Sequence, residues 1–116
     1  MNGKELQAAR KVLMLDVREA AELIGGVSKR SWQYWEAGRS KVPDDVGRKM
    51  AELLKRRQTL LEEAEAWARA GHGGQVPYYA SFHDFDNAHP GDGILAWRIG
   101  QSVAAELHAR LGVALV

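Results

Sequence analysis

The stretch that decides the fold is DVREAAELIGGVSKRSWQYWEAG, residues 16–38. Asp16 and Glu19 have the spacing of a capping box, in which side chains and backbone amides cap each other at the start of a helix. Gly25-Gly26 would end that helix, because glycine readily adopts the left-handed backbone of a sharp turn. Ser28 is a favoured N-cap for a following helix. The stretch therefore predicts two short helices joined by a tight turn.

The second of these helices, expected over residues 29–36, has two unlike faces. Trp32 and Trp35 lie three residues apart and share one face, where core packing is a better explanation than stacking on bases. An apolar inner face with a polar outer face is typical of a helix docked on the surface of a domain. The outward side chains are those of Lys29, Arg30, Ser31, Gln33 and Tyr34.

Two helices joined by a turn, the second with a polar outer face, are the parts of a DNA-binding helix-turn-helix motif. Arginine can pair with guanine, and glutamine with adenine, in the major groove, so Arg30 and Gln33 are the expected base readers. We expect phosphate contacts from Arg39, Lys41 and the backbone amides near Ser28. The expected partner is therefore double-stranded DNA.

The rest of the chain is also mainly helical by its pattern. Asn2 and Glu5 suggest a capping box for a first helix that ends near Leu13. The further expected elements are a long fourth helix from Pro43 to about Ala70, a break at residues 71–74, a short edge strand near residues 76–80, one or two helical turns over residues 81–88, and a terminal helix from Ile94 to about Leu111. We place a helix-turn-helix DNA-binding domain at residues 1–58 and a C-terminal dimerisation region at residues 59–116.

The long fourth helix carries a seam of residues spaced alternately by four and three, which is typical of a coiled coil. Beyond Leu60 the seam should lie past the core of the first domain and meet a second element or a second chain, so Leu60 and Trp67 are expected in a dimer contact. Arg57 interrupts the seam. It could snorkel, or pair with Glu62 or Glu63 of a second chain. The seam residues are Val46, Met50, Leu53, Arg57, Leu60, Ala64 and Trp67.

Charge and composition narrow the classes of protein. Residues 1–58 carry 13 basic and 8 acidic side chains, whereas residues 59–116 carry 3 and 7, so only the first half suits a polyanion. The chain has no cysteine, no apolar run long enough for a membrane span and no signal-peptide pattern, so we expect a cytoplasmic protein. The spacing of His83, Asp84, Asp86 and His89 fits no familiar metal-ligand pattern. We expect no metal, no cofactor and no enzymatic activity.

Residues 27–39, VSKRSWQYWEAGR, resemble the recognition helix of Cro/C1-type (XRE-like) repressors. Val27, Ser28, Glu36, Gly38 and Pro43 match the family pattern. That resemblance implies a lambda-repressor-like helical domain in which Arg10 pairs with Glu36. The sequence departs from the family pattern at Gly26, which adds one residue to the turn.

A closer resemblance covers nearly the whole chain. KELQA at residues 4–8, LMLDV at 13–17, RSWQYWE at 30–36, VPDDV at 42–46 and WR…QSVAA at 97–105 are similar to the YdiL-like proteins, which include anti-CRISPR-associated repressors. The resemblance implies a homodimeric autorepressor that binds an inverted repeat in its own promoter. It also implies dimerisation through the part after the long helix, here Val76, Tyr78 and Tyr79 with Val103 and Leu107 of the terminal helix.

Two other functions stay open. The same basic face could bind RNA and regulate translation, although the deep, narrow major groove of RNA would shift the contacts to backbone and loop bases. Alternatively the chain could be a protein-interaction module, such as the antitoxin of a toxin pair.

Overall fold

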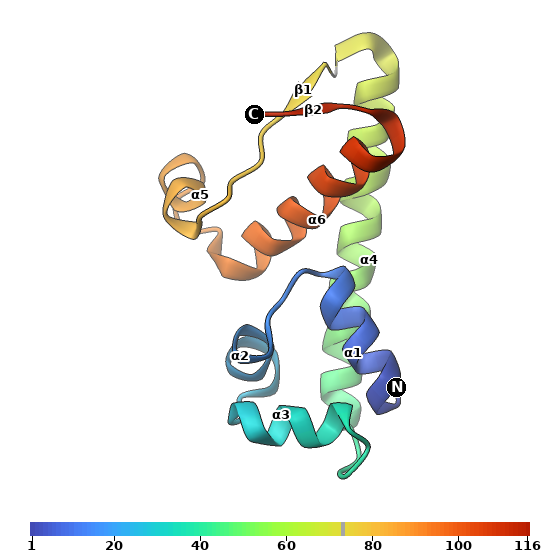
Figure 1. Ribbon diagram of the computed structural model, residues 1–116, viewed down its shortest axis with the longest axis vertical. Helices are drawn as coiled ribbons and strands as arrows, with labels where there is room; N and C mark the ends of the chain where they lie inside the picture. The colour runs from blue at the N-terminus through green and yellow to red at the C-terminus, as the bar shows by residue number, and fades with distance from the viewer. Residues whose placement is uncertain (73) are drawn as a thin grey trace. The chain divides into compact units, whose positions relative to one another are not determined.

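The computed structural model describes residues 1–72 and 74–116, which form two compact units, Met1–Lys55 and Arg56–Val116 (Figure 1). The prediction of a mainly α-helical fold is confirmed. The domain boundary after residue 58 stays a prediction. Gly73, part of the predicted break, lies outside the described residues.

Unit 1 contains α1 (Gly3–Val12), α2 (Val17–Ala20), the π-helical turn η1 (Ala21–Gly25), α3 (Lys29–Glu36) and the first part of α4 (Asp44–Trp67). Both predicted capping boxes are present. The side chain of Asn2 accepts a hydrogen bond from the Glu5 amide at 2.8 Å, and that of Asp16 accepts one from the Glu19 amide at 2.7 Å. Local sequence signals therefore fix where the first two helices begin.

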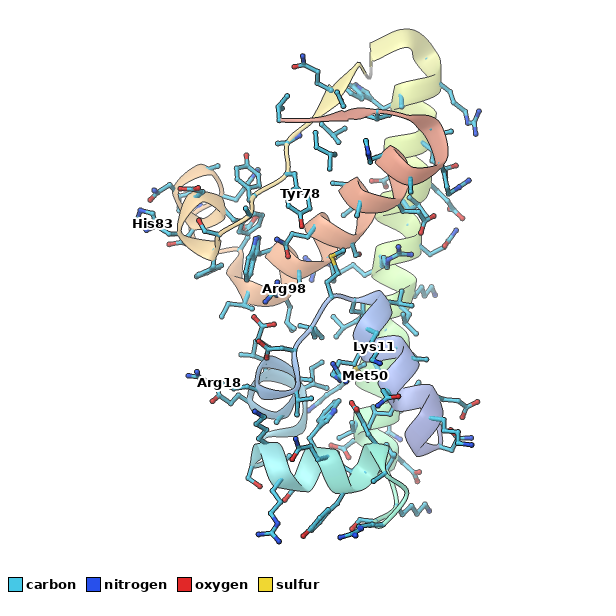
Figure 2. All side chains as sticks on the ribbon, viewed as in Figure 1. Lys11, Arg18, Met50, Tyr78, His83 and Arg98 are labelled. Carbon is cyan, nitrogen blue, oxygen red and sulfur yellow. The ribbon has the colours of Figure 1, made fainter. Side chains whose placement is uncertain are left out.

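The core of unit 1 is apolar and draws on every helix of the unit. Its most deeply buried large side chains are Leu6, Leu13, Trp32, Val46 and Met50, the last of which is labelled in Figure 2. The start of α1 lies directly against the end of α3. A Cβ at Gly3 would lie 2.7 Å from the carbonyl oxygen of Glu36, so the approach of the two helices requires glycine.

Unit 2 contains the rest of α4, the π-helical segment η2 (Ala68–His72), β1 (Gln75–Val76), α5 (Phe82–Ala88), α6 (Gly93–Leu111) and β2 (Ala114–Leu115). Gly71, at φ 88°, interrupts helical geometry where the sequence predicted a break. The short strand expected near residues 76–80 is reduced to β1, although beyond it the Tyr78 amide still donates to the Val116 carbonyl at 2.8 Å. β1 pairs in parallel with β2, a second strand that the sequence did not predict.

The second part of α4 packs on α6 of its own chain, so the second element expected beyond Leu60 is α6. The helix face differs by one residue from the predicted seam: Leu61 is buried with Val103 and Leu107, whereas Leu60 is 40% exposed and Trp67 50% exposed. Ala64 of the predicted seam packs against the same cluster and Arg57 bonds to α6, so the packing within this unit follows the seam in part.

Arg57 joins α4 to α6 within the chain. Its Nε donates to Ser102 Oγ at 3.0 Å and its Nη2 to Glu106 Oε1 at 2.7 Å, so Arg57 has two partners within its own chain. The hydrogen bond from Arg57 holds the pKa of Glu106 below its ordinary value, although partial burial acts in the opposite direction.

Candidate nucleic-acid interface

The polar face of α3 and the loop after it lie on one side of unit 1. In Figure 2 long side chains project from α3 and this loop away from the rest of the unit. The side chains of Lys29, Arg30 and Gln33 are exposed, and those of Ser31 and Tyr34 are half-buried. Ser28 begins the helix as predicted, since its Oγ accepts a hydrogen bond from the Ser31 amide at 3.1 Å. The structure thus gathers the predicted outward set of α3 on one accessible surface.

Two tryptophans anchor the opposite face of α3. Trp32 is fully buried and Trp35 is 9% exposed, with ring centroids 5.5 Å apart. Trp32 Nε1 donates to Glu36 Oε2 at 2.5 Å, so the polar edge of the ring is also satisfied. This burial fixes which residues of α3 point outward.

An ion pair joins α1 to the end of α3, between the two residues that the family resemblance implied. Arg10 Nε and Nη2 donate to the two carboxylate oxygens of Glu36 at 2.6 and 3.0 Å, and Arg10 Nη1 donates to the Leu15 carbonyl at 3.1 Å. Burial alone would raise the pKa of Glu36, but hydrogen bonds from Arg10 and Trp32 and the charge of Arg10 outweigh it and lower that pKa.

The lowered pKa of Glu36 predicts a pH dependence of stability. Because the unfolded carboxylate takes up a proton near its ordinary pKa of 4.5 and the folded one only at lower pH, the pair stabilises the fold above pH 4.5. That stabilisation is lost as the pH falls through the folded pKa. The difference in unfolding free energy between the wild type and Glu36→Gln should therefore shrink as the pH is lowered from 7 to 3, measured by thermal unfolding.

The control for this experiment is Glu22→Gln, which removes an exposed ion pair with Arg18. Exposed pairs contribute little, so this variant should follow the wild type at every pH. A constant difference between wild type and Glu36→Gln across the whole range would contradict the assigned role of the Arg10–Glu36 pair.

The turn between α2 and α3 contains Gly26, the extra residue noted in the sequence. The amides of Gly26 and Val27 both bond to the Ala21 carbonyl, which widens the end of the helix into the π-helical turn η1. Gly26 has φ 61°, the left-handed conformation that glycine favours. A Cβ at Gly25 would lie 3.1 Å from the ring of Trp35. Both glycines therefore have structural roles, one in conformation and one in close packing.

The basic loop after α3 folds back on the end of the helix. Gly38 has φ 78°, and the amides of Arg39 and Ser40 donate to the Tyr34 carbonyl at 2.9 and 3.3 Å. The side chains of Arg39 and Lys41 are exposed. These two cations therefore extend the basic surface that begins on α3.

A second candidate site is a mostly apolar hollow of about 720 Å³ in unit 2. Its walls come from α4, α5, α6 and the segment around β1. Five of the seven predicted dimerisation residues line it: Leu60, Val76, Tyr79, Val103 and Leu107. Trp67 and Tyr78 do not. Phe85 and Trp97, which also line it, were not predicted, although an aromatic residue in a polar stretch, as Phe85 is, is a usable signal. Trp97 Nε1 donates to the Tyr79 carbonyl at 2.7 Å, which fixes part of the wall.

The described residues contain no group of three or more histidine, cysteine or acidic side chains arranged to hold a metal ion. Within that same part of the chain, no helix has both the length and the apolar character that crossing a membrane requires. His83, one member of the histidine and aspartate set considered above, contacts Asn87 on α5 at 3.2 Å.

Known proteins are similar to this chain over almost its whole length. The model of the Aca2/YdiL-like family matches residues 1–115. The Aca2 repressor of Pectobacterium phage ZF40 is 47% identical over 105 residues, which cover 90% of each chain. The protein YdiL of Escherichia coli strain K12 is 30% identical over 111 residues, which cover 94% of each chain.

Proposed function

The chain belongs to the Aca2/YdiL-like family, and from that premise we propose that it is a repressor that binds a specific double-stranded DNA site. One relative carries the name of repressor. The observation that carries the proposal for this chain is α3, with tryptophans buried on one side and Arg30 and Gln33 exposed on the other. The wider Cro/C1-type placement stays a prediction.

In this proposal α2 with η1 and α3 form a helix-turn-helix, and α3 enters the major groove. Arg30 pairs with guanine and Gln33 with adenine, while Lys29 and Ser31 contribute polar contacts. Phosphates are held by Arg39, Lys41 and the amides at the start of α3, where the helix dipole also favours an anion. Repression follows when the protein covers a promoter, and no chemistry on the DNA is needed.

We also propose that the protein acts as a homodimer joined through the hollow of unit 2. An apolar hollow bordered by the exposed Leu60 is a surface that a second copy would cover. Val103 and Leu107 are already covered within the chain, so they support the floor of the hollow, and Leu60, Val76 and Tyr79 make the contacts. Two copies of α3 would then read an inverted repeat with half-sites about 34 Å apart.

Selection of a randomised duplex library by the purified full-length protein tests this function. The expected result is enrichment of an inverted repeat whose half-sites are about one helical turn apart. An RNA hairpin of the same sequence should compete poorly. If no duplex were enriched and the hairpin bound tightly, the alternative of an RNA-binding translational regulator would be favoured. A stable protein partner that copurifies through residues 59–116 would favour the antitoxin-like module.

Substitutions on α3 and in the loop after it should have different kinds of effect on DNA binding. Arg30→Ala should cost about 1–3 kcal/mol on the selected site and relax the preference at one base position, because a base contact is lost. Lys41→Ala should weaken binding to all sequences alike and lower the salt dependence, because a phosphate contact is lost. Titrations of the selected and a scrambled duplex at several salt concentrations measure both effects. Unchanged affinity of Arg30→Ala for the selected site would disprove the assignment of α3 as the reading helix.

A further inference from the structure

Tyr34 lies between the two arginines of the proposed DNA-binding face and contacts both. Its hydroxyl accepts a hydrogen bond from Arg30 Nε at 2.8 Å, and the Cζ of Arg30 lies 5.5 Å from the centre of its ring. The Cζ of Arg39 lies 5.6 Å from the same ring centre. Distances below about 6 Å are in the range of cation–π attraction. One tyrosine therefore gathers two guanidinium groups.

The backbone of Tyr34 strengthens this arrangement. Arg30 and Tyr34 are four residues apart on α3, so their side chains are neighbours on the helix surface. Arg39 is not on the helix, but its amide and that of Ser40 bond to the Tyr34 carbonyl. Tyr34 thus contacts the side chain of Arg30 through its hydroxyl and ring, and holds Arg39 beside α3 through its ring and its carbonyl.

Such an arrangement matters because a free arginine side chain loses conformational entropy when it binds. A guanidinium that is already oriented loses less, which improves affinity without any new contact. We infer that Tyr34 is a positioning residue that orients Arg30 and Arg39 for DNA before the DNA arrives. This inference rests on the proposed function. It assigns Tyr34 a role through the two arginines and no direct contact with DNA.

A double-mutant cycle on the duplex selected by the wild type tests the inference. Tyr34→Phe removes the hydroxyl and keeps the ring, so it should weaken binding about three- to tenfold through Arg30 alone. In the Arg30→Ala background the same substitution should cause no further loss. Arg39→Ala should cost as much in Tyr34→Phe as in the wild type, but less in Tyr34→Ala, where the ring is absent. Thermal unfolding checks that each variant is folded.

Two results would overturn the inference. If Tyr34→Phe weakened binding equally with and without Arg30, the hydroxyl would contact DNA directly. If Tyr34→Phe had no effect in either background, the hydroxyl would play no part in DNA binding. The Nε–H resonance of Arg30, recorded without DNA, separates this question from the proposed function. It should be protected from solvent exchange in the wild type and lose that protection in Tyr34→Phe. If the wild type selects no duplex, the proposed function fails, and the positioning role of Tyr34 in DNA binding fails with it. The hydrogen bond between Arg30 and Tyr34 is tested separately, by this resonance.

Discussion

Trp32→Ala is expected to destabilise unit 1 by about 3–5 kcal/mol, the usual cost of truncating a large buried aromatic residue. Trp32 is fully buried, packs against Trp35, and donates its Nε1 hydrogen to Glu36. The substitution leaves a cavity under α3 and removes a partner from the Arg10–Glu36 pair. A small unit has a total stability of only several kcal/mol, so much of the variant should be unfolded at 37 °C and should bind no DNA.

Thermal and denaturant unfolding measure this loss, and Gln33→Ala is the matched control on the same helix. Gln33 is exposed, so the control should unfold as the wild type does while it loses affinity for the selected duplex. Trp32→Phe keeps most of the ring volume and should fall between the two in stability. A Trp32→Ala variant that folds normally and fails only in DNA binding would show that Trp32 stacks on bases and does not pack in the core.

The features predicted from sequence are those with short-range causes. The capping boxes at Asn2 and Asp16, the cap at Ser28 and the break near Gly71 each depend on a few adjacent residues, and each was found where expected. The inward side of α3 followed from the spacing of its two tryptophans. For the same reason the outward residues of α3 could be named in advance, because the two faces of one short helix determine each other.

The features missed depend on partners far along the chain. β2 has two residues, Ala114 and Leu115, and it forms because the chain after α6 lies beside β1. The local sequence pattern of two residues does not predict such a pairing. Arg57 pairs with Glu106, which lies 49 residues further along the chain. Because that partner is so distant, the sequence showed Arg57 only as an interruption of an apolar seam. The seam itself continued from the first half of α4, although α6 covers Leu61 instead of Leu60.

The candidate site divides in the same way. The polar residues of α3 were predictable, but the grouping of Arg30 and Arg39 around Tyr34 depends on how the loop after Gly38 folds back. The spacing of Arg30 and Tyr34 by four residues was a signal in the sequence that was not used. No comparable signal marks Arg39, because its place is set by hydrogen bonds from backbone amides.

Leu60→Glu is expected to convert the protein from a dimer to a monomer and to lower its affinity for the full inverted repeat by about 100-fold or more. Leu60 borders the apolar hollow of unit 2 and is 40% exposed in the single chain. A carboxylate there would be buried without a partner in the proposed dimer, but would remain in water in the monomer. The loss of affinity is large because two linked recognition helices gain from effective concentration, and a monomer does not.

Sedimentation and duplex titration measure the two effects, and a half-site duplex separates them. Leu60→Glu should bind a single half-site as the wild-type monomer does, because Leu60 lies in unit 2 and α3 lies in unit 1. Val12→Glu is the matched control: Val12 is 46% exposed on α1, outside the proposed interface, and its substitution should leave the dimer intact. If Leu60→Glu stayed dimeric, or Val12→Glu became monomeric, the hollow would not be the dimer interface. The exposed leucine beside it would then need a different partner.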